Sequence, residues 1–142
     1  MGGAMSRNKG KRGEREIITL LQPLVDQVYE ANELDAPVLK RNTLQSDGGG
    51  FDIVGLDWIA LEVKYHETFQ VEKWWEQCMR QAGPGQMPVL VYRRNGMRTW
   101  LVRMLGFVGE PSCGHTVPVS VRWEDFLLWF RTRLAKELKN EW

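Results

Sequence analysis

Two acidic residues and one lysine stand out because their types and spacing could support metal-dependent phosphodiester hydrolysis. Asp52 lies in the run 51–54, and Glu62 and Lys64 follow it after a short interval. Carboxylate oxygens are the ligands that Mg²⁺ prefers, and this ion usually keeps several of its waters rather than being enclosed by protein. A lysine beside such an ion can orient an attacking hydroxide and offset the charge that builds on phosphorus.

A tight turn between two extended segments would bring these side chains together. The β-branched and aromatic runs 51–54 and 58–65 flank Gly55-Leu56-Asp57, which is short enough to be the turn of an antiparallel hairpin. Because side chains alternate along a strand, Glu62 and Lys64 would share one face, and a suitable register would place Asp52 beside them. A turn-capping aspartate and the solvent-facing charges of an amphipathic strand fit the same pattern, so the residues alone leave both interpretations open.

A helix is predicted upstream of these strands, opening with the basic segment that begins at Lys9. Its apolar stripe has helical spacing and consists of Ile17, Leu20, Leu21, Leu24, Val25 and Val28. Glu14 falls in the first turn, where an acid also complements the helix dipole without any site. The strand-like segment 38–44 carries Arg41, and the glycine-rich loop 45–50 is either a plain connection or an element that touches DNA.

Four short motifs, taken in order, resemble those of the PD-(D/E)XK nuclease superfamily. They are Gly13-Glu14-Arg15-Glu16 at a helix start, Arg41 on a strand, Phe51-Asp52-Ile53-Val54, and Leu61-Glu62-Val63-Lys64. Within the superfamily they are similar to the archaeal-type Holliday-junction resolvases and their phage-encoded relatives. Segments 88–94 and 99–104 look like two further strands of such nucleases, so the resemblance covers residues 9–104. It implies a restriction-endonuclease-like α/β fold, with a central mixed β-sheet flanked by helices.

A metal site follows from this resemblance. It implies that Asp52 and Glu62 are direct metal ligands, that the backbone carbonyl of Val63 is an additional ligand, and that Glu14 completes the site through water. The implied ion is Mg²⁺, for which Mn²⁺ can substitute. The family's proline before the aspartate is absent, because Phe51 stands there, which is a common departure.

Catalytic and DNA-binding residues follow from the resemblance too. Lys64 matches the catalytic lysine, and Arg15 and Arg41 match basic residues that engage phosphate, so the catalytic set comprises Glu14, Asp52, Glu62, Lys64 and Arg41. Residues 1–10 are polar, basic and glycine-containing, which predicts a flexible arm that contacts DNA rather than part of a core. The predicted DNA-binding residues are Lys9, Lys11, Arg12, Arg15 and Arg41.

Length and composition indicate one nuclease domain over residues 1–142. The chain is 43% hydrophobic and 26% charged, as is ordinary for a globular protein. Its net charge of +1 is low for a DNA-binding protein, but basic residues gather in 1–16 and 77–109 while 26–76 is acidic. No apolar stretch suits a membrane span or a secretory signal, which predicts a cytoplasmic protein, in the host cytoplasm if phage-encoded. Two separated cysteines indicate neither a zinc site nor a disulfide scaffold.

The remaining segments are expected to be architectural. One helix is predicted from Val71 to Ala82, with Trp74 and Trp75 in the core or an interface rather than stacked on bases. A loop over 106–118 and a C-terminal helix over 120–142 should follow, and the wide aromatic face of that helix would cover the sheet or a second copy. Arg93, Arg94 and Arg98 fit DNA contacts and solvated edge charges equally well.

These inferences lead to an expected function with two alternatives. We expect a structure-selective, metal-dependent DNA endonuclease that resolves four-way junctions. Since two strands related by a two-fold axis must be cut, a homodimer is the natural assembly. The alternatives are a PD-(D/E)XK nuclease acting on other DNA, either restriction-like or genome-degrading, and a non-catalytic DNA-binding module on the same scaffold.

Overall fold

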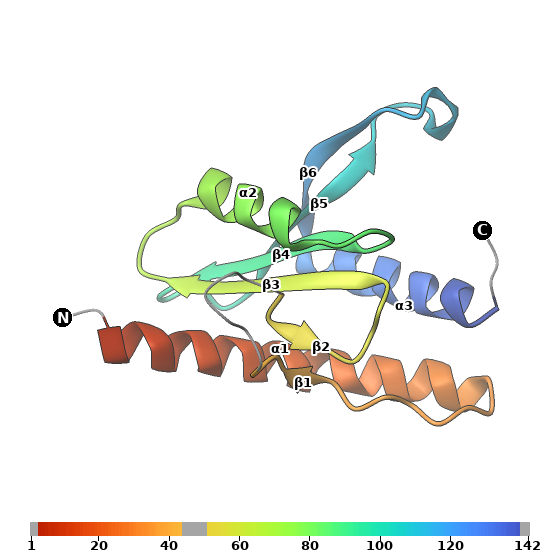
Figure 1. Ribbon diagram of the computed structural model, residues 1–142, viewed down its shortest axis with the longest axis horizontal. Helices are drawn as coiled ribbons and strands as arrows, with labels where there is room; N and C mark the ends of the chain where they lie inside the picture. Colours follow the sequence, from red (N-terminus) through yellow and green to blue (C-terminus); the bar gives the residue numbers. More distant parts are fainter. Residues whose placement is uncertain (1–2, 44–50, 140–142) are drawn as a thin grey trace.

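The computed structural model describes residues 3–43 and 51–139 as a six-stranded β-sheet with three α-helices (Figure 1). The glycine-rich loop 45–50 lies outside the described residues. The elements in chain order are α1 (Gly3–Ala31), β1 (Lys40–Arg41), β2 (Ile53–Val54), β3 (Ile59–His66), α2 (Val71–Gln81), β4 (Met87–Arg94), β5 (Leu101–Phe107), a 3₁₀ turn (Pro111–Cys113), β6 (Thr116–Arg122) and α3 (Trp123–Lys139).

The sheet is mixed, and its strands lie in the order β1-β2-β3-β4-β5-β6. Strands β3 and β4 are parallel over their whole length, and the other neighbouring pairs are antiparallel. The crossover between β3 and β4 runs through α2, as a parallel pair requires. The predicted hairpin is confirmed, since β2 pairs antiparallel with β3 through Ile53 and Leu61. The predicted α/β fold with a central mixed sheet is likewise confirmed.

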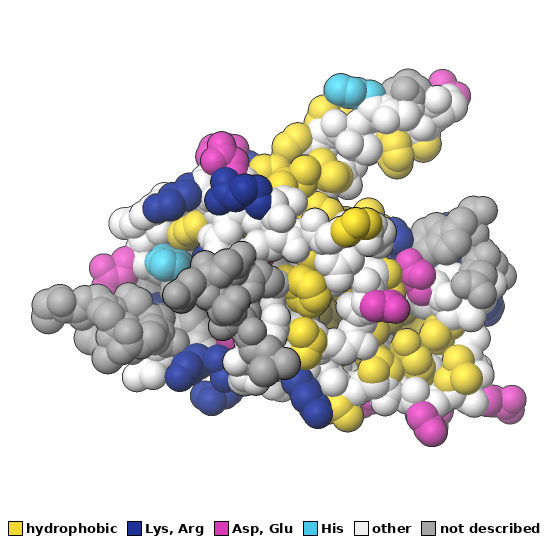
Figure 2. Space-filling view, in the orientation of Figure 1, with side chains coloured by type: hydrophobic (Ala, Val, Ile, Leu, Met, Phe, Trp, Pro, Cys, Tyr) yellow, Lys and Arg dark blue, Asp and Glu magenta, His cyan; other side chains and the backbone are white. Residues whose placement is uncertain are grey.

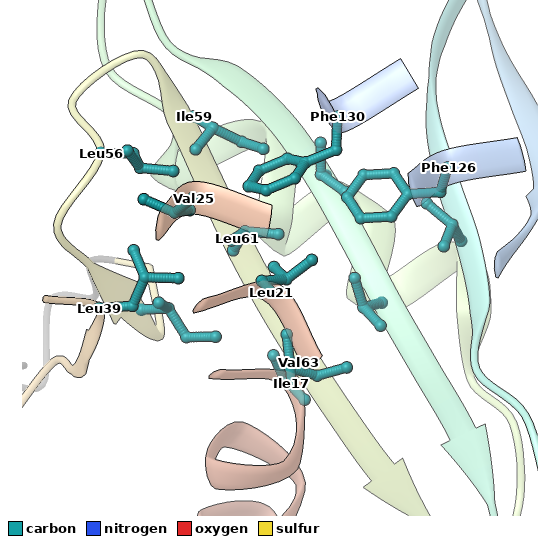
Figure 3. Close-up of a cluster of buried hydrophobic side chains, with 14 of the residues drawn as sticks. Ile17, Leu21, Val25, Leu39, Leu56, Ile59, Leu61, Val63, Phe126 and Phe130 are labelled. Carbon is teal, nitrogen blue, oxygen red and sulfur yellow. The ribbon is translucent and has the colours of Figure 1, made fainter. Parts of the chain in front are cut away.

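The helices cover both faces of the sheet and create two separate apolar clusters. Helices α1 and α3 lie on one face, where residues of both pack on β3, β4 and β5 (Figure 3). The side chains labelled there are Ile17, Leu21, Val25, Leu39, Leu56, Ile59, Leu61, Val63, Phe126 and Phe130. Helix α2 covers the other face, where Trp74, Trp75 and Cys78 pack on Leu90 and Tyr92. Both tryptophans are therefore core residues, as their sequence pattern favoured.

Alternation along β4 explains how one strand serves both clusters. Val89 and Val91 face α1 and α3, whereas Leu90 and Tyr92 face α2. Strand β3 is in register with β4, pairing Glu62 with Leu90. The face of β3 that carries Glu62 therefore points to the α2 side of the sheet. None of the described helices is long and apolar enough to cross a membrane.

Three expected features differ in the structure. Residues 3–10 belong to α1 rather than to a flexible arm, because the chain runs as one helix from Gly3 to Ala31. The expected loop 106–118 instead contains the end of β5, a 3₁₀ turn and the start of β6, and the two strands form a hairpin that extends beyond the helices (Figure 1). The C-terminal helix consequently begins at Trp123, after β6, and not at residue 120.

Helix α1 makes a close contact with the sheet at Gly13. A Cβ atom placed there would lie 3.2 Å from the indole of Trp100, 3.3 Å from Cβ of Tyr65 and 3.5 Å from Cγ1 of Val63. A side chain larger than hydrogen would therefore press on β3 and on Trp100, which directly precedes β5. This contact fixes the height of the next residue, Glu14, above the sheet.

The variant Gly13→Val should therefore destabilise the protein, whereas the same change one helical turn earlier should not. Forcing a branched side chain into this contact is expected to cost about 2 kcal/mol of unfolding free energy. Gly10 has no atom within 4 Å of a built Cβ, so Gly10→Val should stay within about 0.5 kcal/mol of the parent protein. Urea unfolding of the three proteins measures both effects. Equal stabilities of the two variants would contradict this account of α1 packing.

Candidate active site

Asp52 is fixed in place by main-chain hydrogen bonds on both sides. Its N–H donates to the carbonyl of Leu61 at 2.8 Å, and its own carbonyl accepts from the N–H of Asn42 at 2.8 Å. Its Oδ2 accepts from the N–H of Val63 at 2.7 Å. The side chain is only 7% exposed. The carboxylate is thus held against the edge of β3, just before the first residue of β2.

Glu62 and Lys64 project from β3 on the face turned to α2. The Nζ atom of Lys64 lies 3.5 Å from Oε1 of Glu62, with side-chain exposures of 18% and 3% respectively. The predicted alternation is therefore realised, because the two side chains share one face and touch. Asp52 lies close enough to Glu62 for their carboxyl groups to hydrogen bond.

Burial changes the acid–base properties of this pair. The pKa of Glu62 is raised from 4.5 to about 8, mainly by desolvation and next by the charge of Asp52, and Lys64 opposes both effects. Burial and the charges of Glu62 and Asp52 also raise the pKa of the Cys78 thiol on α2, which places α2 beside the carboxylates. Two buried carboxylates held close together repel each other, so a cation bound between them would be strongly stabilised.

Glu14 and Arg41 approach the carboxylate pair from the α1 side. The Nε atom of Arg41 donates to Oε2 of Glu14 at 2.6 Å, and the two side chains are 23% and 13% exposed. The pKa of Glu14 is raised overall, because burial and the charge of Asp52 outweigh the opposing hydrogen bond from Arg41. Helix α1, β1, β2 and β3 thus bring all five residues of the expected catalytic set to one edge of the sheet.

The donor atoms at this edge fit a hard divalent cation. Within residues 3–43 and 51–139, no three or more His, Cys, Asp and Glu side chains form a metal-binding group. The buried carboxylates of Asp52 and Glu62 are two oxygen donors, and the N–H of Val63 points toward Asp52. The C=O of a strand residue points to the same side as its N–H, so the Val63 carbonyl faces this edge too. Two carboxylates and one carbonyl leave room for the waters that Mg²⁺ retains.

The basic residues expected to bind DNA lie on the N-terminal half of α1. Lys9, Lys11, Arg12 and Arg15, with Asn8, line a hollow of about 560 Å³. Dark blue side chains are visible along the lower edge of the molecule, over α1 (Figure 2). Arg15 is exposed and one residue from Glu14. The hollow and the carboxylates are thus reached from the same stretch of helix.

Tyr65 is a neighbour of this basic surface that the sequence reasoning missed. The cationic groups of Lys9, Arg12 and Arg93 lie 5.6, 5.3 and 4.5 Å from the centre of its ring. A guanidinium N–H of Arg12 also donates to the tyrosine hydroxyl at 3.3 Å. The available signal was its position directly after Lys64, which turns its side chain to the α1 face of β3.

The arginines 93, 94 and 98 do not form one cluster. Arg93 makes two hydrogen bonds to the carboxylate of Glu16, at 2.9 and 3.1 Å, and also stacks on Trp100 at 4.6 Å. Its role is to fasten α1 to β4. Because α1 begins at Gly3, Glu14 and Glu16 both lie beyond its first turn, so the interpretation that Glu14 complements the helix dipole does not hold. Arg94 is exposed with its guanidinium 5.2 Å from the ring of Phe69, and Arg98 is exposed in the turn that follows β4.

The variant Glu62→Gln should alter how stability depends on pH in the absence of divalent cations. Glu62 titrates near 4.5 when unfolded and near 8 when folded, so folding takes up a proton between these values. Its contribution to stability is therefore present below pH 4.5 and lost as pH rises toward 8, by about 1.4 kcal/mol per unit of pKa difference at most. The neutral amide removes this loss, and the variant's Tm at pH 8 in EDTA should exceed that of the parent by several degrees.

The exposed glutamate Glu76 on α2 offers a matched control. Glu76→Gln should follow the parent at every pH, and calorimetry from pH 5 to 8 compares the three proteins. An unchanged pH profile for Glu62→Gln would show that Glu62 is not held protonated in the folded protein.

Comparison with known proteins agrees with this geometry. The family described as phage putative PDDEXK endonuclease matches residues 5–105, a span that contains Glu14, Arg41, Asp52, Glu62 and Lys64. No curated protein and no solved structure gives a significant match to the chain. Because the family match covers well over half of its residues, the chain belongs to this phage family of PD-(D/E)XK endonucleases.

Proposed function

We propose that the protein is a structure-selective DNA endonuclease that resolves Holliday junctions by hydrolysing phosphodiester bonds with a divalent metal ion. The observation that carries the proposal is the meeting of Asp52, Glu62 and Lys64 with the Glu14–Arg41 pair at one sheet edge. The family match supports endonuclease activity. Preference for junctions rests on the motif resemblance to archaeal-type resolvases.

Mg²⁺ is the proposed ion, and Mn²⁺ is expected to substitute for it. Asp52, Glu62 and the Val63 carbonyl would hold it directly, with Glu14 acting through a water. When bound, the ion would supply Lewis-acid activation of a water and stabilise charge on the phosphoryl oxygens. Because burial raises the pKa of Glu62 to about 8, metal binding near neutral pH would be accompanied by release of a proton from this group.

The chain's own residues would position the water and the DNA. Lys64 has its ammonium 3.5 Å from Glu62 and can donate a hydrogen bond to the attacking water while remaining anchored on β3. Arg41 is oriented by Glu14 through Nε, so the outer side of its guanidinium can contact the phosphate being cut. Lys9, Lys11, Arg12 and Arg15 would bind the neighbouring backbone without reading its sequence.

Lys64→Ala and Asp52→Asn should each lower DNA nicking by at least about a hundredfold. Gel-shift affinity should change little, because the altered groups act on the metal and the phosphorus rather than on the basic surface of α1. The asparagine keeps an oxygen that can accept from Val63, so the local fold should persist. EDTA should abolish nicking, and Mg²⁺ or Mn²⁺ should restore it.

Lys136→Ala is the matched control, since Lys136 is exposed on α3, away from the carboxylates. This variant should cut DNA at the parental rate. Full activity in either Lys64→Ala or Asp52→Asn, or nicking that persists in EDTA, would contradict the proposed mechanism.

A substrate panel tests junction preference. A four-way junction should be cut at least about tenfold faster than linear duplex of the same sequence, with nicks placed symmetrically across the branch point. Two-fold nicking also predicts a homodimer, with a light-scattering mass near twice 16.5 kDa. Equal cutting of junction and linear duplex would favour a different DNA substrate within the same superfamily.

A further inference from the structure

A row of side chains on β3 leads from the buried carboxylates to the surface. Glu62, Lys64 and His66 share one face of the strand, and they become progressively more exposed toward its C-terminal end. Two residues of strand span about 6.7 Å, so His66 follows Lys64 at a distance comparable to that between neighbouring phosphates of a DNA strand. The residues around His66 have no part in the proposed metal site or in the basic surface of α1.

Aromatic rings and one arginine surround His66. Its ring packs on Trp74 with centroids 5.0 Å apart and an interplanar angle of 34°. Phe69 meets Trp74 and Tyr92 edge-on, at 6.4 and 5.3 Å. Arg94 is the register partner of His66 on β4, and its guanidinium lies 5.2 Å from the Phe69 ring. We refer to His66, Phe69 and Arg94 as the aromatic platform.

The platform combines a rigid base with exposed upper members. Trp74 and Tyr92 are 4% and 6% exposed, whereas Phe69 is 36% exposed and both His66 and Arg94 lie at the surface. Phe69 directly precedes the N-cap residue of α2 and packs on the fourth helical residue, so part of its burial serves to start the helix. That role needs an apolar side chain but not a ring. It therefore does not explain why an aromatic face is exposed beside an arginine.

We infer that the aromatic platform binds an unpaired nucleotide next to the scissile phosphate, with the base stacked on His66 and Phe69 and its phosphate beside Arg94. This inference rests on the proposed nuclease function. Aromatic rings stack on bases of any sequence, and an arginine beside them pairs with the backbone. A base inside continuous duplex already has both faces covered, so only an unpaired or extruded base can use such a surface. The substrate class is therefore DNA with an unstacked nucleotide at a branch, flap or gap.

The test combines base-analogue fluorescence with cleavage rates. 2-Aminopurine is placed in turn at each nucleotide on either side of the branch point of a flap substrate, and binding is followed in EDTA. We expect one position to be quenched severalfold by the parent protein, and His66→Ala or Phe69→Leu to abolish that quenching. In Mg²⁺ both variants should lower the ratio of flap to duplex cleavage about tenfold, which matches the loss of one stacked base.

Leucine at position 69 keeps the apolar contact that starts α2, so the variant should fold, and circular dichroism checks this. Phe107→Leu is the matched control, since that phenylalanine is 52% exposed on β5 and distant in the sheet from the platform. It should retain the parental quenching and rate ratio.

Two results would overturn the inference. One is quenching that neither platform variant changes, and the other is an equal fall in the cleavage of flap and duplex. Failure of the proposed function is distinguishable from both, because a protein that cuts no DNA in Mg²⁺ or Mn²⁺ would still give a decisive fluorescence result in EDTA.

Discussion

The site depends on one electrostatic constraint, the burial of two carboxylates side by side at an open edge of the sheet. Asp52 and Glu62 are 7% and 3% exposed, and such a pair is costly unless a cation or a shared proton offsets the repulsion. The fold supports this arrangement by anchoring β3 in the apolar cluster beneath α1 and α3, and by pairing it along its whole length with β4, whose other face packs on α2. A flexible edge would simply separate the two acids.

Helix α1 holds four successive residues rigidly, although each of them has a different environment. With about 3.6 residues per turn, four successive residues point in four directions. Gly13 touches the sheet, Glu14 reaches Arg41, Arg15 faces solvent and Glu16 binds Arg93. Any shift of the helix would alter the candidate active site, the basic surface and the contact with β4 together. This coupling explains why a glycine stands at the contact with β3 and Trp100.

Local patterns predicted the parts of the fold that depend on local interactions. The hairpin around Gly55, helix α2 and the shared face of Glu62 and Lys64 follow from turn chemistry and side-chain periodicity, and all are present. The N-terminal helical turns and β6 were not predicted. The N-terminal segment is polar and contains glycine, so its own helical preference is weak. Pro118 and the nearby glycines are unfavourable in a strand, so the sequence did not indicate β6, which pairs only with β5. The pairing of Arg93 with Glu16 joins residues far apart in the chain, which no local pattern reveals.

The brevity of β2 has a specific cause that connects the fold to the chemistry. Sequence patterns favoured a strand from residue 51, yet regular pairing begins only at Ile53. Just before Ile53, the carboxylate of Asp52 accepts a hydrogen bond from the N–H of Val63. In a longer β2, a main-chain carbonyl of that strand would accept this hydrogen bond instead. Continued main-chain pairing would have satisfied both polar groups of Val63 and closed this edge. By substituting a side chain for a strand, the protein keeps the Val63 carbonyl directed at the edge where Asp52 and Glu62 meet, so the irregularity in the sheet is what creates the site.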